Sequence, residues 1–215
     1  MAGHSASTLN FPAVLGALGF LAASGGLLLA IAAALIFYFA HKQKLARMAA
    51  WTIGAGATVY FAILLGFSAF SHETSLGHGQ EKYFCEIDCH LAYSVVDIKS
   101  VTDGSTKNYV VTLKTRFDET TISPQRPKDA PLTPSPRDVR LIDASGREYS
   151  PTAESGTSLM TPLKPSDFYM TQLEFKLPAD ASGLRLLVRT APAWPDHFVI
   201  GDENSWLHKR TYFAL

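Results

Sequence analysis

Apolar residues follow two different periods along this chain. Phe11 to Ala40 and Met48 to Phe70 are two runs without a charged residue, and each is longer than the roughly 20 apolar residues that cross a bilayer as a helix. From Leu91 onward apolar and polar residues alternate, most clearly between Tyr109 and Phe117, as they do in a half-buried strand. The pattern predicts a membrane α-helical hairpin followed by an all-β domain.

Short alternating runs separated by turn residues continue to the end of the chain. The predicted strands are Leu91–Val101, Tyr109–Phe117, Val139–Leu141, Tyr169–Leu177, Leu184–Val188, Phe198–Ile200 and Trp206–Phe213. About seven such strands are typical of an antiparallel, immunoglobulin-like β-sandwich. We therefore predict a hairpin in residues 1–70, with helices at about 11–40 and 48–70, a flexible polar linker in 71–83, and an extracytoplasmic sandwich in 84–215.

The link between the two apolar runs predicts the topology. Lys42, Lys44 and Arg47 lie there, and no other Lys or Arg precedes Lys82. Positive residues next to membrane spans stay in the cytoplasm. Both termini and the β domain would then lie on the periplasmic or extracellular side of the inner (plasma) membrane. A cleavable signal peptide would have a shorter apolar core behind a basic start.

Small residues recur at every fourth position in both runs. They are Ala22, Gly26, Ala30 and Ala34 in the first, and Gly54, Thr58, Ala62 and Gly66 in the second. Such stripes let helix backbones approach closely. They predict packing of the two helices on each other or docking on a larger membrane partner. Neither run contains Asp, Glu, Lys or Arg, which argues against an ion or proton path.

Both cysteines of the chain lie in the stretch Cys85-Glu-Ile-Asp-Cys89-His90. Two cysteines in an extracytoplasmic domain most often form a disulfide. Thiolates with an imidazole can instead hold haem or copper. We expect a disulfide and no cofactor, with haem c or copper at Cys85, Cys89 and His90 as the alternative. Further ligands in that case are His72, His78, Met160, Met170, His197 and His208.

Each cofactor alternative corresponds to a resemblance. Cys85-x-x-x-Cys89-His90 resembles a variant of the c-type haem motif Cys-x-x-Cys-His that is one residue longer. Two membrane helices followed by a β domain are similar to the layout of cytochrome oxidase subunit two, whose dicopper motif has the same cysteine spacing. In that family the motif lies late in the β domain, whereas here it precedes the first predicted strand.

The β region itself resembles immunoglobulin-like extracytoplasmic domains of the telokin-like type. The resemblance covers about Leu91 to Thr190 and is carried by VTLKTRF, VRLIDASGREY, PLKPSDFYMTQLEFKLP and LRLLV. It implies a domain that binds, scaffolds or caps. The chain also lacks a nucleophile elbow and an HExxH motif, so we expect no enzyme. Zero net charge gives no argument for a nucleic-acid partner.

Two further stretches bear on partners. Asp118 to Arg137 contains five prolines and is too long for a hairpin loop, so it is either a partner-contacting arm or a loosely ordered loop. Trp194, His197, Trp206 and His208 lie close in sequence, where aromatic packing or a membrane-interface position is expected. The sequence thus predicts an accessory or scaffold subunit that docks on a larger membrane complex, for example a respiratory or photosynthetic one. The alternative is an electron-transfer subunit.

Overall fold

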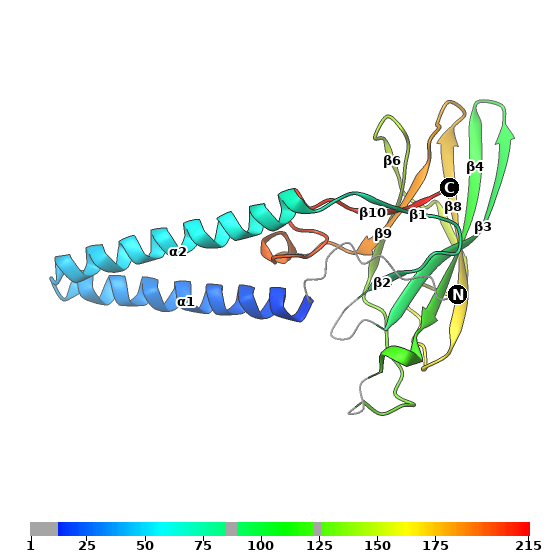
Figure 1. The fold of residues 1–215 in the computed structure, drawn as a ribbon. Coiled ribbons are helices and arrows are strands. Elements are labelled where there is room, and N and C mark those ends of the chain that lie inside the picture. The colour runs from blue at the N-terminus through cyan, green and yellow to red at the C-terminus, as the bar shows by residue number, and fades with distance from the viewer. Residues whose placement is uncertain (1–12, 85–89, 123–125) are drawn as a thin grey trace. The chain divides into compact units, whose positions relative to one another are not determined.

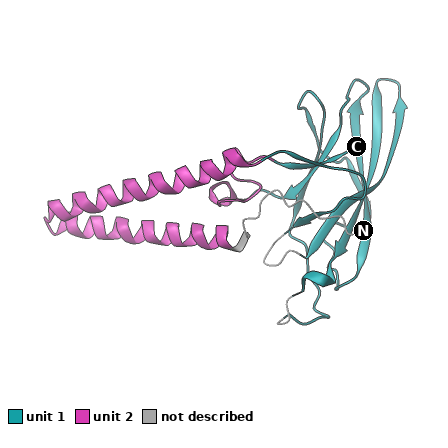
Figure 2. Ribbon diagram, in the orientation of Figure 1, with its two compact units in different colours: residues 1–8, 72–192, 210–215 teal, residues 9–71, 193–209 magenta. Residues whose placement is uncertain are grey.

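The computed structural model describes residues 13–84, 90–122 and 126–215 (Figure 1). It divides into two compact units (Figure 2). One contains residues 72–192 and 210–215, and the other contains both helices together with residues 193–209. The predicted fold class, a pair of helices and a β-sandwich, is confirmed. The predicted boundary is not, because residues 193–209 group with the helices and not with the sandwich.

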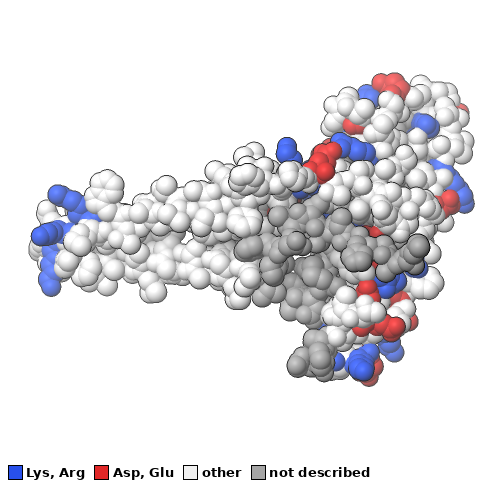
Figure 3. Space-filling view, viewed as in Figure 1, with Lys and Arg blue, Asp and Glu red and all other residues white. Residues whose placement is uncertain are grey.

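The helical unit is built from α1 (Ala13–Phe39) and α2 (Gln43–Phe70). Both helices are long and apolar enough to cross a membrane. The second begins five residues earlier than predicted, at Gln43 instead of Met48, because Gln, Lys, Leu, Ala and Arg all favour helix. Figure 3 shows basic side chains gathered at the tip of the hairpin, while its visible length carries no charge.

The β unit contains two five-stranded sheets. The first has the order β1 (Thr74–Leu76), β10 (Thr211–Ala214), β9 (Arg185–Thr190), β5 (Arg137–Ile142) and β6 (Glu148–Tyr149). The second has the order β2 (Lys82–Phe84), β3 (Leu91–Asp103), β4 (Thr106–Phe117), β8 (Phe168–Pro178) and β7 (Ala153–Gly156). The pairing of β1 with β10 is parallel, and the other pairings of these strands are antiparallel.

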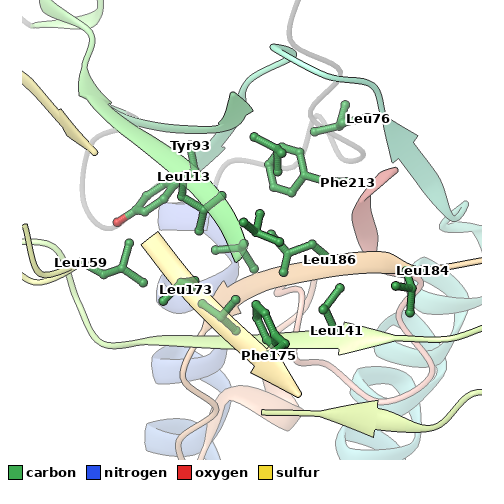
Figure 4. Close-up of a cluster of buried hydrophobic side chains, with 14 of the residues drawn as sticks. Leu76, Tyr93, Leu113, Leu141, Leu159, Leu173, Phe175, Leu184, Leu186 and Phe213 are labelled. Atoms are coloured by element: carbon green, nitrogen blue, oxygen red, sulfur yellow. The ribbon is translucent and has the colours of Figure 1, made fainter. Parts of the chain in front are cut away.

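One hydrophobic core lies between the sheets (Figure 4). Leu113 and Phe175 from the second sheet meet Leu141, Leu186 and Phe213 from the first, and all are at most 1% exposed. In β8 every second side chain is buried, which confirms the alternation predicted for that strand. The period of two along β4 and β8 therefore directs one face of each strand into this core.

Two regions differ from the sequence prediction. The supposed flexible linker at 71–83 contains β1 and the start of β2, and β1 pairs Leu76 with Phe213 near the end of the chain. The strands predicted at Phe198–Ile200 and Trp206–Phe213 are wrong except for the last residues, which belong to β10. A short 3-10 helix, η2 (Asp196–Phe198), lies in that region instead.

Candidate functional site

The segment that carries both cysteines connects two paired strands. Phe84 at the end of β2 pairs with Leu91 at the start of β3, so residues 85–90 link neighbouring strands. Cys85 and Cys89 lie outside the described residues. The disulfide, haem and copper predictions that depend on them therefore remain predictions.

His90 is buried in the sandwich unit. Its side chain is 1% exposed and its ring stacks on Phe117, with centroids 5.3 Å apart. Nδ1 is hydrogen-bonded to the hydroxyl of Thr121, and that hydroxyl donates to the carbonyl of Asp118 at 2.7 Å. Because a hydroxyl has a single hydrogen, Nδ1 must be the donor to Thr121.

The other predicted ligands lie in separate places. His78 shares a 2.8 Å hydrogen bond with the carbonyl of Val96, and Met160 and Met170 are 48% and 39% exposed. His72 is exposed beyond the end of α2, while His197 and His208 belong to the helical unit. Within residues 13–84, 90–122 and 126–215, no group of three or more His, Cys, Asp or Glu side chains could hold a metal ion.

An ionic network holds the strand that leads into the cysteine segment. Arg116 donates to both carboxylate oxygens of Glu81, at 2.8 and 2.7 Å, and to Asp118 at 3.2 Å. Tyr83 donates to the same Asp118 carboxylate, which also accepts from Thr120. Two parallel bonds of a guanidinium to one carboxylate fix orientation as well as distance. The network therefore fastens β2 to the end of β4.

The network also sets the charge of its acids. The hydrogen bond from Arg116 holds the pKa of Glu81 below its ordinary value. Burial alone would raise the pKa of Asp118, but hydrogen bonds from Tyr83, Thr120 and Arg116 outweigh it and hold that pKa well below the usual range. Burial and the bond to Asp118 raise the pKa of the Tyr83 hydroxyl. Both carboxylates are thus held ionised.

Arg137 secures the other side of the same strand. Its guanidinium lies over the rings of Phe84 and Tyr93, at 4.2 and 5.3 Å from their centroids. Lys82 also lies over Phe84, at 4.7 Å, and donates to the carbonyl of Val188 at 2.6 Å. Cations over aromatic faces stabilise such contacts electrostatically. The strands on both sides of the cysteine segment are therefore firmly held.

The second candidate region is residues 193–209, which we call the aromatic strap. It leaves the sandwich after β9 and returns at β10, and it packs on the helices of its own unit. Tyr60 of α2 donates to the carbonyl of Phe198 at 2.5 Å, and the rings of Phe198 and Trp206 lie 4.7 Å apart, both against Phe61. At its end, the Lys209 amide donates to the Ser71 hydroxyl at 2.8 Å.

Gly16 of α1 accommodates the strap. It is buried, and a Cβ added there would collide with the carbonyl oxygen of Ile200. Only glycine leaves room for so close an approach of backbone. The repeat of small residues in the sequence did not single out Gly16, because its partner lies far along the chain.

The glycines of the predicted small-residue stripes do not lie against the neighbouring helix. A Cβ added at Gly26 or Gly54 would meet nothing within 4 Å among the described residues, and Gly66 is equally open. The two alternatives predicted for the stripes, packing of the helices on each other or docking on a partner, remain predictions. Ala22, Gly26 and Ala30 instead line a groove.

This groove has a volume of about 600 Å³. Its walls come from α1, α2 and the strap, and they are Phe20, Ala22, Ala23, Ser24, Gly26, Leu27, Ala30, Thr52, Ile53, Gly56, Ala57, Val59, Tyr60, Phe61, Ile63, Trp194 and Phe198. Of the predicted stripe on α2, Thr58 and Ala62 are exposed. Small and apolar side chains thus leave a hollow that the hairpin itself does not fill.

Burial shifts the pKa values of an acidic and a histidine side chain of the strap. Burial, reinforced by the negative charges of Asp196 and Glu203, raises the pKa of Asp202 to about 6, although the amide of Asn204 donates to it at 2.7 Å. Burial lowers the pKa of His208. Both shifts favour uncharged forms, in contrast to the ionised Glu81 and Asp118.

Comparisons with known proteins bear on the fold alone. No protein-family model matches the chain, and no curated protein matches it. Two solved structures are similar: an uncharacterized β-sandwich protein from Clostridium difficile 630 and the secreted protein MPT63 from Mycobacterium tuberculosis. The first is 7% identical with a TM-score of 0.40, and the match covers 67% of this chain and 95% of that one. The second is 10% identical with a TM-score of 0.42, covering 67% and 98%. The chain is a β-sandwich with two apolar helices.

Proposed function

We propose that this chain is a non-enzymatic accessory subunit, anchored in the inner membrane by α1 and α2, which docks through its hairpin on a larger membrane protein. The observation that carries the proposal is the unfilled groove around Gly26. Small residues are favoured where helices pack closely in lipid, and these are not used for close packing of α1 on α2. A helix of a partner would fill the groove.

Charge supports the membrane part of the proposal. The basic residues Lys42, Lys44 and Arg47 lie at the hairpin tip, and the positive-inside rule assigns that tip to the cytoplasm. A reporter fused at Lys44 should therefore be cytoplasmic, and one fused after Leu215 should be extracytoplasmic. A cytoplasmic reporter at Leu215 would contradict the extracytoplasmic position of the sandwich, and cytoplasmic reporters at both positions would contradict the anchoring.

Two matched pairs of glycines test the docking. Gly26 and Gly56 line the groove, whereas Gly25 and Gly54 lie beside them in sequence and do not. Added Cβ atoms meet nothing within 4 Å at all four among the described residues, so leucine at each should leave the chain folded. Gly26→Leu and Gly56→Leu should remove the chain from its complex on native gels of mildly solubilised membranes, while Gly25→Leu and Gly54→Leu should not. Equal behaviour of all four would contradict docking through the groove.

A second candidate function is electron transfer through a cofactor held by Cys85, Cys89 and His90. The observation that favours it is the hydrogen bond that His90 Nδ1 donates to Thr121. Metal-binding histidines commonly donate their other nitrogen in this way. Haem c or copper there would supply one-electron redox chemistry.

An absorption spectrum with metal analysis of the purified chain separates the two functions. A chain with a Cys85–Cys89 disulfide should be colourless, and His90→Ala should change its assembly little. A haem band that survives denaturation, or copper that is lost in both His90→Ala and Cys85→Ser, would make the chain a redox subunit.

A further inference from the structure

The aromatic strap exposes large apolar side chains. Trp194 is 81% exposed, Leu207 is 72% exposed and Trp206 is 45% exposed. Leu207 has a φ of 63°, in the left-handed region that non-glycine residues rarely adopt. Clusters of exposed apolar side chains mark surfaces that contact another apolar phase. The strap is therefore built to present these side chains, at some cost in backbone conformation.

The contacts of the strap on α2 give its depth along the helix. Its contacts Tyr60 and Phe61 lie about ten residues before the end of α2 at Phe70, which is about 15 Å along a helix. From Arg47, the last basic residue of the tip, to Phe61 is about 21 Å of helix. The hydrocarbon core is about 30 Å thick. The contact with Phe61 thus falls roughly 10 Å inside the far boundary of the core, a depth that interfacial segments reach.

The backbone of the strap is bonded within the strap. The amides of Phe198, Val199, Asp202, Ser205, Trp206 and His208 donate to carbonyls of residues 195–205. The Ser205 hydroxyl donates to the carbonyl of Val199, and His197 Nδ1 is bonded to the carbonyl of Asn204 at 2.7 Å. Irregular backbone is tolerated at membrane depth only where its polar groups are satisfied. The strap meets this requirement at these positions.

We propose that the aromatic strap is inserted in the bilayer interface on the side opposite the basic tip. Trp206 and Leu207 then contact lipid, and so does Trp194 in the chain alone, where no partner helix fills the groove that Trp194 lines. The occupant of this surface is phospholipid, because the strap continues the apolar surface of the two helices and is rich in Trp, which is enriched at that depth. The inference rests on the anchoring of the hairpin that we proposed above. The new element is a membrane contact for residues 193–209, which in the sequence come between the sandwich strands β9 and β10.

Depth-dependent quenching of tryptophan fluorescence tests the insertion. The chain has three tryptophans, Trp51, Trp194 and Trp206, so each single-tryptophan variant is made by changing the other two to Phe. The full chain is placed in nanodiscs whose lipids carry a nitroxide at a shallow or a deep acyl position, and iodide is the aqueous quencher. Trp194 and Trp206 should be quenched several-fold more by shallow nitroxides than by iodide. Trp194 is the more direct probe, because it is the more exposed of the two.

Trp51 serves as the control for anchoring. It lies on α2 and is 76% exposed, so lipid nitroxides should quench it if the hairpin crosses the bilayer. Quenching of Trp51 by lipid together with quenching of Trp194 and Trp206 by iodide would overturn the insertion and leave the anchoring intact. Absence of lipid quenching from all three would overturn the anchoring as well.

Discussion

The two units shift the pKa of a carboxylic acid in opposite directions, as one acid in each unit shows. Asp118 in the sandwich unit accepts hydrogen bonds from Tyr83, Thr120 and Arg116, which hold its pKa below the ordinary value. Asp202 in the strap is buried near other acids, and its pKa is raised to about 6. The first environment stabilises an ion and the second disfavours one. The raised pKa of Asp202 agrees with the less polar surrounding that we propose for the strap.

The same contrast holds for apolar side chains. The sandwich buries its large apolar residues between two sheets, whereas most of those on α1 and α2 are exposed. The buried residues of α2 are Leu64 and Ser68. Exposure of this kind is stable when lipid replaces water around the helices. If the hairpin is anchored as proposed, the two units depend on different solvents for the same kind of residue.

The largest difference between the two units is expected when a buried and an exposed phenylalanine are each replaced by alanine. Phe175 in β8 is 1% exposed, and Phe39 at the end of α1 is 74% exposed. Phe175→Ala should lower the free energy of unfolding of the sandwich by about 3–5 kcal/mol through the cavity that it leaves. Phe39→Ala should leave it unchanged. Urea unfolding of the full chain in nanodiscs, followed by a sandwich-specific signal, measures both. Equal losses would show that the two units do not unfold independently.

Gly16 and Gly19 test how the strap is held on α1. A Cβ at Gly16 would collide with Ile200, whereas at Gly19 it would meet nothing within 4 Å in the described part of the chain. Gly16→Ala should lower the protection of the strap by up to about 3 kcal/mol, as overpacking does. Gly19→Ala should be neutral or slightly stabilising, since Ala favours helix. Hydrogen exchange of residues 193–209, measured by mass spectrometry, gives the difference. Unchanged exchange in Gly16→Ala would contradict the contact.

These regions also show how far the sequence alone predicts the structure. The strands β3, β4 and β8 were predicted because their sequence patterns are local, and the helices because their apolar runs are long. The strap was predicted as two strands because aromatic and β-branched residues favour strand. Its conformation depends instead on Tyr60, Phe61 and Gly16, more than a hundred residues away.

The same reason explains the other differences. Residues 74–76 contain no local strand pattern, and they form β1 only by pairing with β10 at the end of the chain. The candidate residue His90 was identified from its neighbours in sequence, but its burial against Phe117 and its bond to Thr121 depend on the strands around it. The residue types indicated which side chains could act as ligands, but they did not indicate where the fold places them.

Asp202 gives the third prediction. Its pKa is about 6 in the folded chain and about 4 when unfolded. The folded state therefore binds the extra proton between these values, and the stability of the strap should fall as the pH rises from about 4 to about 6. Asp202→Asn should abolish this dependence and stabilise the strap at pH 7 by about 3 kcal/mol, which corresponds to about two pKa units. Glu203→Gln should shift the dependence to lower pH, because Glu203 contributes to the raised pKa. Hydrogen exchange against pH measures both, and a flat wild-type profile would contradict the shift.

For Asp118 we expect the opposite dependence of stability on pH, and a smaller effect of substitution. Its folded pKa is lowered, so its contribution is present above the unfolded value of about 4 and is lost as the pH falls through the folded pKa. Asp118 is buried, but its charged partner Arg116 is partly exposed to solvent, so Asp118→Asn should cost only about 1 kcal/mol at pH 7. That cost should shrink as the pH falls below about 4. Asp97→Asn is the control, since Asp97 pairs with Lys99 while both side chains are largely exposed. Urea unfolding at pH 7 and pH 3 measures the two variants. A cost for Asp118→Asn that grows on acidification would mean that Arg116 and Tyr83 do not hold the carboxylate ionised. The pKa values of Asp118 and Asp202 would then not be shifted in opposite directions.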